Sequence, residues 1–401
     1  MQSIRKVNSR KEFIMVSTDL QKMELLVGSV PLSLYQEKIK ETDQFSENDL
    51  IFVLLGLYGE VGSIMSAAKK YKREPSEHIS LRDAIEEEFG DALWYFTAVC
   101  RRVDCDLSDV FEKALDDNDK TEICANESAV APISQSITPK EKGELNELLI
   151  DLGQVAAELL KLKQDCVNDL GLLVHFAGVY VRCINSVGLS FAKVVRKNIN
   201  KTLGRFIDPK LSDLPDFDKD FVEEEQLPRN FEITITQRKS GESYLMWNGV
   251  FLGSPLTDNI ADSDGYRFHD VFHLAYAAIL HWSPTFRALI KHKRKSNKDV
   301  DEGQDSGRAI VVEEGLTAWL YSYSKGHDYF NGKENLPFDV LKTIKKFVSG
   351  YEVEECPLKL WEKAILDGYK VFRQVKENEG GVIIGDRFKR TLEYKAIGKL
   401  K

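Results

Sequence analysis

Three acidic residues near the start of the chain have the spacing of a metal site. Glu60 lies between Leu57 and Ile64, at the margin of the apolar face of a predicted helix. Glu88 and Asp91 are three residues apart, so they share one face of the next predicted helix. Clustered carboxylates repel one another unless a cation neutralises them, and an all-oxygen site suits Mg²⁺ or Mn²⁺. The three acids therefore predict a metal site, with solvated helix charges as the alternative.

The helices that carry these acids are predicted from the spacing of apolar residues. Apolar side chains recur every three or four positions over 48–71, again over 85–103, and in a third pattern over 107–115. The first pattern ends in a basic tail formed by Lys69, Lys70, Lys72 and Arg73. The tail either meets phosphate or only satisfies the end of the helix. The N-terminal part is predicted to be all-helical.

The sequence around the acids resembles the MazG-like, all-α nucleoside triphosphate pyrophosphohydrolases. That family carries ExxE on one helix and ExxD on the next, and this chain has GLYGEVGS from residue 56 and EEFGDALWYF from residue 87. The Leu34-Tyr35-Gln36 segment is similar to the family's YQ element, and the resemblance covers roughly residues 31–118. It implies that four acids hold Mg²⁺, which carries the triphosphate while water attacks and releases pyrophosphate and a nucleoside monophosphate.

By this resemblance, Glu60, Glu88 and Asp91 are the catalytic metal ligands. Ser63 stands where the family has its second glutamate, so a serine oxygen, a water or a neighbouring carboxylate would complete the metal's ligands. The predicted nucleotide-binding residues are Tyr35, Gln36, Lys69, Lys70, Trp94 and Tyr95. Aromatic residues at helical spacing also fit a helical core.

A weaker internal repeat follows, and we predict a second, degenerate MazG-like unit over residues 138–206. Three of its four acid positions hold Gln154, Ala157 and Leu172, and only Asp169 remains. This asymmetry suggests a pseudodimer, in which the first copy holds the metal and the second completes the helical bundle.

A second candidate metal site lies in the C-terminal half. His269 and His273 are four residues apart on one helix face, with Asp270 beside the first. Glu313 and Glu314 lie in an apolar run, where a buried carboxylate needs a cation or hydrogen-bond donors. This set either holds a metal or forms a satisfied hydrogen-bond network in the core, and the sequence leaves both hypotheses open.

The predicted fold class is mainly α, a tandem MazG-like helical bundle followed by a helix-rich α+β domain. We expect a first unit over 1–125, the degenerate unit over 138–206, an acidic linker over 207–230, and a C-terminal accessory domain over 231–401. This domain is predicted to have strands near 231–237 and 244–247 and a short strand or turn near 380–385. This last domain, with its HDxxHLA and GRAxVxEEG segments, resembles the accessory domain at the C-terminus of some MazG-like proteins. A basic stretch at 291–298 is predicted to be a solvated loop, with a phosphate clamp for a nucleotide or an RNA end as the alternative.

Composition limits the classes of function. The chain has 401 residues, 43% of them apolar, and a net charge of −9, so nothing draws it to duplex nucleic acid. No uninterrupted apolar run reaches membrane-spanning length, and the first residues have no signal-peptide pattern, so we expect a cytoplasmic protein that does not bind a membrane. Six scattered cysteines predict reduced thiols.

Together these features predict a metal-dependent enzyme, a nucleoside triphosphate pyrophosphohydrolase with Mg²⁺ or Mn²⁺ as cofactor, in a homo-oligomer such as a dimer. Ser63 and the decayed second copy also allow a nucleotide-binding sensor, in which the C-terminal domain is the effector or partner-binding part, for example in a defence system. A helical interaction scaffold is the third hypothesis, and it predicts no stabilisation by nucleotide.

Overall fold

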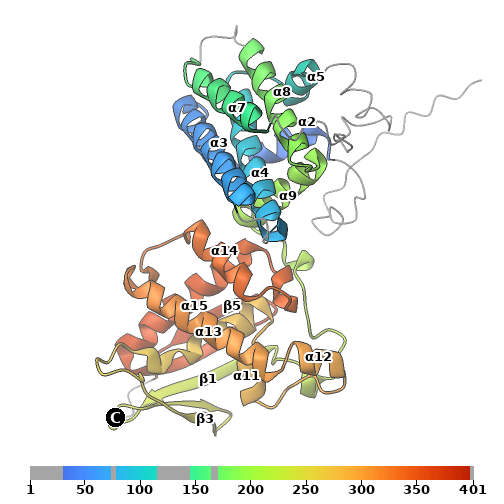
Figure 1. Ribbon diagram of the computed structural model, residues 1–401. Coiled ribbons are helices and arrows are strands. Elements are labelled where there is room, and N and C mark those ends of the chain that lie inside the picture. The colour runs from blue at the N-terminus through green and yellow to red at the C-terminus, as the bar shows by residue number, and fades with distance from the viewer. Residues whose placement is uncertain (1–29, 74–77, 115–144, 164–169, 398–401) are drawn as a thin grey trace, which may run out of the picture. The chain divides into compact units, whose positions relative to one another are not determined.

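The chain divides into two compact units, residues 1–199 and 200–401, and each is described here by itself. The computed structural model describes residues 30–73, 78–114, 145–163 and 170–397 (Figure 1). Outside these ranges lie the N-terminal residues, the connector between the two predicted helical copies, two of the six cysteines, Cys124 and Cys166, and Asp169. The four cysteines that the structure describes are free thiols.

The described part of the N-terminal unit consists of helices. They are α2 (Leu32–Thr42), α3 (Leu50–Arg73), α4 (His78–Arg102), α5 (Leu107–Ala114), α7 (Leu145–Leu159), α8 (Leu170–Ser186) and α9 (Phe191–Phe206), the last of which crosses the boundary between the units. α3 packs against α4, α7 packs against α8, and α3 also contacts α7. Buried aromatic rings such as Phe96 and Phe176, with centroids 4.6 Å apart, join α4 to α8. The predicted helical character of this part is confirmed.

α3 has an exposed apolar stripe in addition to its buried face. Ile51, Leu55 and Tyr58 recur at helical spacing and are 71%, 58% and 46% exposed. The segment Leu50–Lys70 also has the length and mean hydropathy, 1.8, of a membrane-spanning helix. The sequence argument missed this because it considered only uninterrupted apolar runs. A core helix of a soluble protein meets the same criteria, so this helix alone is weak support for a membrane span.

The C-terminal unit combines a five-stranded antiparallel sheet with helices. The strands are β1 (Asn230–Gln237), β2 (Ser243–Trp247), β3 (Val250–Leu256), β4 (Gly380–Asp386) and β5 (Thr391–Lys395), in the order β3-β2-β1-β4-β5. The main helices are α10 (Asp270–Ala275), followed by a π-helical turn (Tyr276–Leu280), α11 (Pro284–Leu289), α12 (Lys298–Gly303), α13 (Gly307–Lys325), α14 (Phe338–Phe347) and α15 (Leu358–Asn378). The predicted α+β, helix-rich character is confirmed.

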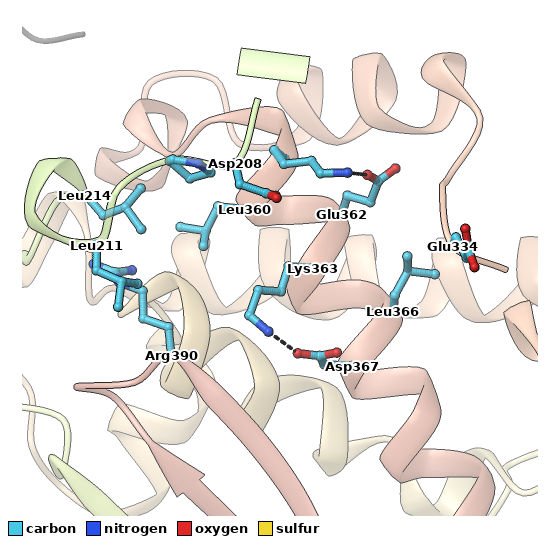
Figure 2. A pocket seen from close by; sticks show the side chains of 12 residues that line it. Asp208, Leu211, Leu214, Glu334, Leu360, Glu362, Lys363, Leu366, Asp367 and Arg390 are labelled. Atoms are coloured by element: carbon cyan, nitrogen blue, oxygen red, sulfur yellow. Dashed lines mark hydrogen bonds and ion pairs between the residues drawn. The ribbon is translucent and has the colours of Figure 1, made fainter. Parts of the chain in front are cut away.

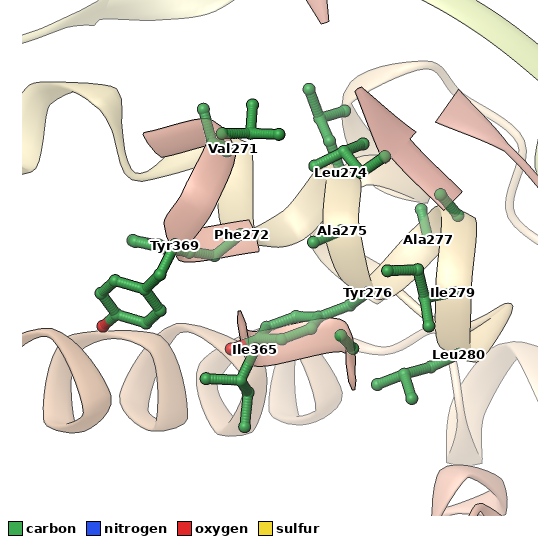
Figure 3. Close-up of a cluster of buried hydrophobic side chains, with 14 of the residues drawn as sticks. Val271, Phe272, Leu274, Ala275, Tyr276, Ala277, Ile279, Leu280, Ile365 and Tyr369 are labelled. Atoms are coloured by element: carbon green, nitrogen blue, oxygen red, sulfur yellow. The ribbon is translucent and has the colours of Figure 1, made fainter. Parts of the chain in front are cut away.

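The core of this unit lies between the sheet and the helices. α10 and α15 pack against β4 and β5, and the inward residues of β1, such as Ile233, are buried. Figure 3 shows α10 and the π-helical turn facing α15, where the rings of Phe272 and Tyr369 have centroids 4.5 Å apart. Alternation of buried and exposed residues along β1 is what a sheet covered on one face requires.

Two glycines of β4 are covered by aromatic rings from the neighbouring strands. A Cβ atom at Gly381 would lie 2.1 Å from the Tyr394 ring of β5, and one at Gly385 would lie 2.1 Å from the Phe231 ring of β1. Any larger residue at either position would displace the ring. The close approach of ring and backbone therefore explains why this inner strand contains glycine.

The prediction of a solvated acidic linker over 207–230 is wrong. Asp218 is 1% exposed and accepts hydrogen bonds from Arg287, at 2.7 Å, and from the backbone N–H of Leu227, at 2.7 Å. The guanidinium groups of Arg294 and Arg387 lie 3.7 Å and 3.4 Å from its carboxylate. The acids of this segment were expected to repel one another, but arginines distant in the sequence neutralise Asp218 and bind the segment to the C-terminal unit.

The basic stretch at 291–298 is likewise only partly a solvated loop. Arg294 is 1% exposed and forms a bidentate pair with Asp305, through its Nε at 3.1 Å and an Nη at 2.7 Å, and pairs with Glu352 at 2.6 Å. The planar guanidinium group has five N–H donors, so it can bind both carboxylates at once. Arg294 therefore joins its own segment to those that carry Asp305 and Glu352.

Replacement of Asp218 should destabilise the C-terminal unit. In Asp218→Asn the three arginines would face one another without their shared carboxylate, so the free energy of unfolding should fall by about 3–5 kcal/mol. Denaturant unfolding followed by tryptophan fluorescence measures this, since four of the five tryptophans lie after residue 230. Glu302→Gln is the matched control, because the Lys298–Glu302 pair is 81% and 70% exposed and should contribute less than about 1 kcal/mol. Equal effects of the two variants would contradict this account of the segment.

Candidate functional site

The structure brings Glu60 of α3 together with Glu88 and Asp91 of α4. One carboxylate oxygen from each residue lies within 4.8 Å of the other two, and all three side chains are partly buried. The buried stripe around Val61 on α3 and around Phe89 on α4 places the acids at the edge of the helix contact. Oxygens at this separation can bind one divalent cation that keeps several waters.

Asp91 is held by a residue that the sequence argument missed. The side-chain amide of Asn198, on α9, donates to Asp91 Oδ1 at 3.3 Å, and the Tyr35 hydroxyl donates to Asn198 Oδ1 at 2.6 Å. Asn198 is 2% exposed and Tyr35 is fully buried. An asparagine within the amphipathic pattern of α9 was the available signal, but nothing in the sequence indicated its partner 107 residues away.

Two glycines allow the helices to approach at this site. A Cβ atom at Gly90 would lie 2.9 Å from the Cβ of Asn198, so the residue before Asp91 must be small for α9 to reach it. At Gly56 a Cβ atom would lie 2.2 Å from the ring of Tyr95, which packs across α3 at that point. Glycine is thus required on steric grounds at these two positions, one in the GLYGEVGS segment and one in the EEFGDALWYF segment.

Tyr95 borders the carboxylates. Burial raises the pKa of Tyr95, and the nearby charges of Glu60 and then Asp91 raise it further. A phenol beside two carboxylates stays protonated and can donate a hydrogen bond. Of the predicted nucleotide-binding aromatics, this is the one beside the acidic cluster.

The other predicted nucleotide-binding residues are placed differently. Tyr35 is buried, and Trp94 is 7% exposed with its indole N–H donating to Thr42 at 3.0 Å, so neither ring face is open to a base. Gln36 accepts a hydrogen bond from the backbone N–H of Leu107 at 2.6 Å, at the start of α5. Their role here is to hold the helices, which corrects the predicted base pocket.

The basic tail lies at the far end of α3. Lys69 and Lys70 are exposed and lie about 14 Å along the helix axis from Glu60. The side chain of Lys72 is outside the described part of the structure, and Arg73 is exposed. Ser63 lies one turn from Glu60 and is partly buried.

In the second helix pair, the positions that correspond to the acids are neutral. Gln154 is exposed on α7, while Ala157 and Leu172 are partly buried on α7 and α8. Gly153 packs against Met65 of α3, since a Cβ atom there would lie 2.5 Å from the Met65 methyl group. The remaining acid of this copy, Asp169, lies outside the described residues.

The C-terminal unit contains the second group of possible ligands. Ligand atoms of His269, His273 and Glu314 lie within 4.8 Å of one another. His273 Nε2 is 3.4 Å from Glu314 Oε1, and His269 Nε2 is 3.7 Å from Glu314 Oε2. Asp270 begins α10 beside His269, and burial of its carboxyl raises the pKa of Asp270, but it is not part of this group.

Glu313 differs from Glu314 because it is fully buried and its carboxylate oxygens have hydrogen-bond partners. Its carboxylate accepts hydrogen bonds from Ser283 Oγ at 2.6 Å and from the backbone N–H of Thr285 at 2.8 Å, and it lies 2.8 Å from His273 Nδ1. Burial opposes protonation of His273, but the combined effects of Glu313 and Glu314 outweigh it and raise the pKa of His273. Glu313 therefore orients the imidazole of His273.

A groove of about 330 Å³ is formed where α15 meets the segment after α9 (Figure 2). Leu360 and Leu366 give it an apolar base, and Lys363 pairs with Asp367 at 2.6 Å on its wall. None of the residues of either ligand cluster lines it. A second ion pair of the groove joins Lys359 to Glu362 at 2.9 Å.

Comparison with known proteins shows a similarity in the C-terminal unit. Residues 212–398 match the family model of the MazG C-terminal domain. A segment of 68 residues, 16% of this chain, is 35% identical to the gene 37 protein of Mycobacterium phage L5, and the match covers 60% of that protein. The chain thus spans less than two thirds of the length of this curated relative. No solved structure matches the chain.

Gly90→Ala should disturb the contact that holds Asp91, because the new methyl group would meet the Cβ of Asn198. Gly59→Ala is the matched control on α3, where nothing lies within 4 Å and alanine favours the helix. We expect Gly90→Ala to have a free energy of unfolding about 1–3 kcal/mol lower than Gly59→Ala, measured by denaturant titration of the N-terminal unit's helical circular dichroism signal. Equal stability of the two variants would show that α9 does not approach Gly90 this closely.

Proposed function

We propose that the N-terminal unit hydrolyses a nucleoside or deoxynucleoside triphosphate to the monophosphate and pyrophosphate, with Mg²⁺ or Mn²⁺ held by Glu60, Glu88 and Asp91. The convergence of these three carboxylates carries the proposal. The match of residues 212–398 to the MazG C-terminal domain supports it, because the N-terminal segments that carry the acids resemble hydrolases of the MazG-like family.

The residues present suit a hard divalent cation. Three carboxylates from two helices offer only oxygen, and Mg²⁺ accepts such a partial set because it retains waters. When bound, the ion would neutralise triphosphate oxygens and make a bound water more acidic. Ser63, one turn from Glu60, keeps an uncharged oxygen where the resembling family has a fourth acid.

The chain's own groups around the acids would position them. Asn198 donates to one oxygen of Asp91 and so fixes the rotamer of that carboxylate, and Tyr35 in turn fixes Asn198. Tyr95, protonated beside Glu60 and Asp91, is placed to donate a hydrogen bond to an anionic substrate group. These contacts pre-organise the site before substrate arrives.

The second helix pair would complete the bundle within one chain. α7 and α8 pack on each other as α3 and α4 do, and α3 contacts α7. With Gln154, Ala157 and Leu172 at the acid positions, this pair would support the first copy without binding a metal itself. We therefore keep the pseudodimer as part of the proposal.

A nucleotide-binding sensor is the second candidate function. Ser63 and the neutral second copy favour it, because fewer anionic ligands weaken metal binding and turnover more than they weaken binding of the base and sugar. In this case the C-terminal unit would be the effector part. Tight binding of a triphosphate without its hydrolysis distinguishes the sensor from the enzyme.

Turnover should depend on Glu88. With Mg²⁺ or Mn²⁺, the purified full chain should release pyrophosphate from at least one common triphosphate, and Glu88→Gln should lower kcat/KM by about 100-fold or more because the metal loses an anionic ligand. Glu87→Gln is the matched control, since this adjacent α4 carboxylate is outside the ligand cluster, and it should retain activity.

A screen of triphosphates with chromatographic product analysis measures both variants. If no substrate yields pyrophosphate but nucleotide stabilises the protein against unfolding, the sensor hypothesis would be favoured over the enzyme hypothesis. Neither turnover nor stabilisation would reject both functions. An equal loss of kcat/KM in Glu87→Gln and Glu88→Gln would show that the carboxylate cluster is not the catalytic site.

We also propose that two copies associate through the exposed apolar stripe of α3, which includes Ile51, Leu55 and Tyr58. A contiguous apolar surface of this kind is typical of an interface. Leu55→Lys should shift the molar mass measured by light scattering from dimer to monomer, while Leu211→Lys, at a similarly exposed position, 57% against 58%, in the other unit, should not. A wild-type monomer at all concentrations would contradict the proposed dimer.

A further inference from the structure

We infer that His269, His273 and Glu314 of the C-terminal unit form a zinc site with an open coordination position. The inference stands apart from the proposed hydrolase site, since the two ligand clusters share no residue and lie in different units. It rests on the orientation of the two imidazoles, the distances between the ligand atoms and the burial of the site.

The hydrogen bonds of the histidines determine which ring nitrogen faces the site. His269 Nδ1 lies 2.9 Å from the backbone carbonyl of Tyr266, which can only accept, so Nδ1 carries the proton and Nε2 carries the lone pair. His273 Nδ1 lies 2.8 Å from Glu313, which selects the same tautomer. In the neutral form of the two rings, both Nε2 atoms therefore present lone pairs toward Glu314.

A cation between the Nε2 atoms and Glu314, either a proton on His273 or a metal ion, would compensate the carboxylate. His273 Nε2 is buried and makes no hydrogen bond to the described residues, although Glu314 Oε1 is 3.4 Å away. His269 Nε2 is 3.7 Å from Glu314 Oε2. Two ligands each about 2.1 Å from a tetrahedral Zn²⁺ are about 3.4 Å apart, so the observed separations suit metal ligands better than hydrogen-bond partners.

The donor set favours zinc over the alkaline-earth ions. Two imidazoles and one carboxylate suit Zn²⁺, whereas Mg²⁺ prefers oxygen. Three protein ligands leave one tetrahedral position for water or an anion, which is the arrangement of catalytic rather than structural zinc sites. Glu314 is 38% exposed, so solvent can reach this position.

Glu313 acts as a positioning residue for the site. It binds His273 Nδ1 and is itself held by Ser283 and by the backbone of Thr285, so the imidazole cannot rotate freely. A carboxylate on the far nitrogen also makes a histidine a stronger ligand. On the other ligand, the Tyr266 ring stacks on His269 with centroids 4.3 Å apart and planes 9° apart.

The experiment uses the full chain dialysed against Zn²⁺ with excess Mg²⁺, which occupies the all-oxygen cluster in the other unit. We expect about one zinc per chain by elemental analysis, and a loss of this zinc in the double variant His269→Gln/Glu314→Gln. Both side chains are more exposed than His273, so the variant should fold, as its circular dichroism verifies. His327→Gln is the control, because this exposed imidazole is outside the cluster and its loss should leave the zinc content unchanged.

Two further readouts separate a metal site from a structural network. At about a hundredfold excess over Kd, zinc should raise the melting temperature of the wild type by about 5–10 °C and leave the double variant unchanged. Co²⁺ in place of zinc should give the visible absorption of a nitrogen-bound ion, which the double variant should lose. Glu313→Gln should keep this spectrum but weaken the affinity about 10- to 100-fold.

Equal zinc content in the wild type and the double variant would overturn the inference. So would a wild type without bound zinc, in which His273 would be an imidazolium shared by Glu313 and Glu314. Loss of the zinc in Glu60→Gln instead would place it at the N-terminal carboxylates and also overturn the inference.

Discussion

Carboxylates that are taken out of water organise both units of this chain. A buried carboxylate needs a positive charge or several hydrogen-bond donors, and each one here is compensated differently. Asp218 is surrounded by arginines, Glu313 is held by a histidine, a serine and a backbone N–H, and Asp91 is bound by Asn198. Where carboxylates approach one another, as in the Glu60, Glu88 and Asp91 cluster, a bound cation would add to this compensation.

The two ligand clusters differ in the ion that each would prefer. The N-terminal cluster offers only oxygen ligands and suits a hydrated ion that binds phosphate oxygens. The C-terminal cluster contains two imidazole nitrogens fixed by their own hydrogen bonds, which suits a borderline-soft ion. A chain with both clusters would respond separately to magnesium and to zinc. Chelators that discriminate between these ions should therefore affect one unit at a time.

The sequence predicted features that depend on local spacing and missed those that depend on distant partners. Glu88 and Asp91 share a helix face by their spacing alone, and the alternation of β1 showed a half-buried strand. Asn198 was missed because its partner is on another helix. The acidic segment was mistaken for a linker because the arginines that neutralise it lie 69 or more residues further along the chain. β5 was not predicted either, since only its pairing with β4 shows that this short segment is a strand.

The sheet of the C-terminal unit has a consequence for biosynthesis. β1 is an inner strand, yet its partner β4 is made about 145 residues later, and the rings over Gly381 and Gly385 come from β5 and β1. Until the ribosome has released residues 380–395, one side of β1 has unsatisfied backbone groups beside an apolar core. A message cut short before this point would give an aggregation-prone chain that quality control can remove. The final strands are thus required to complete the sheet of this unit.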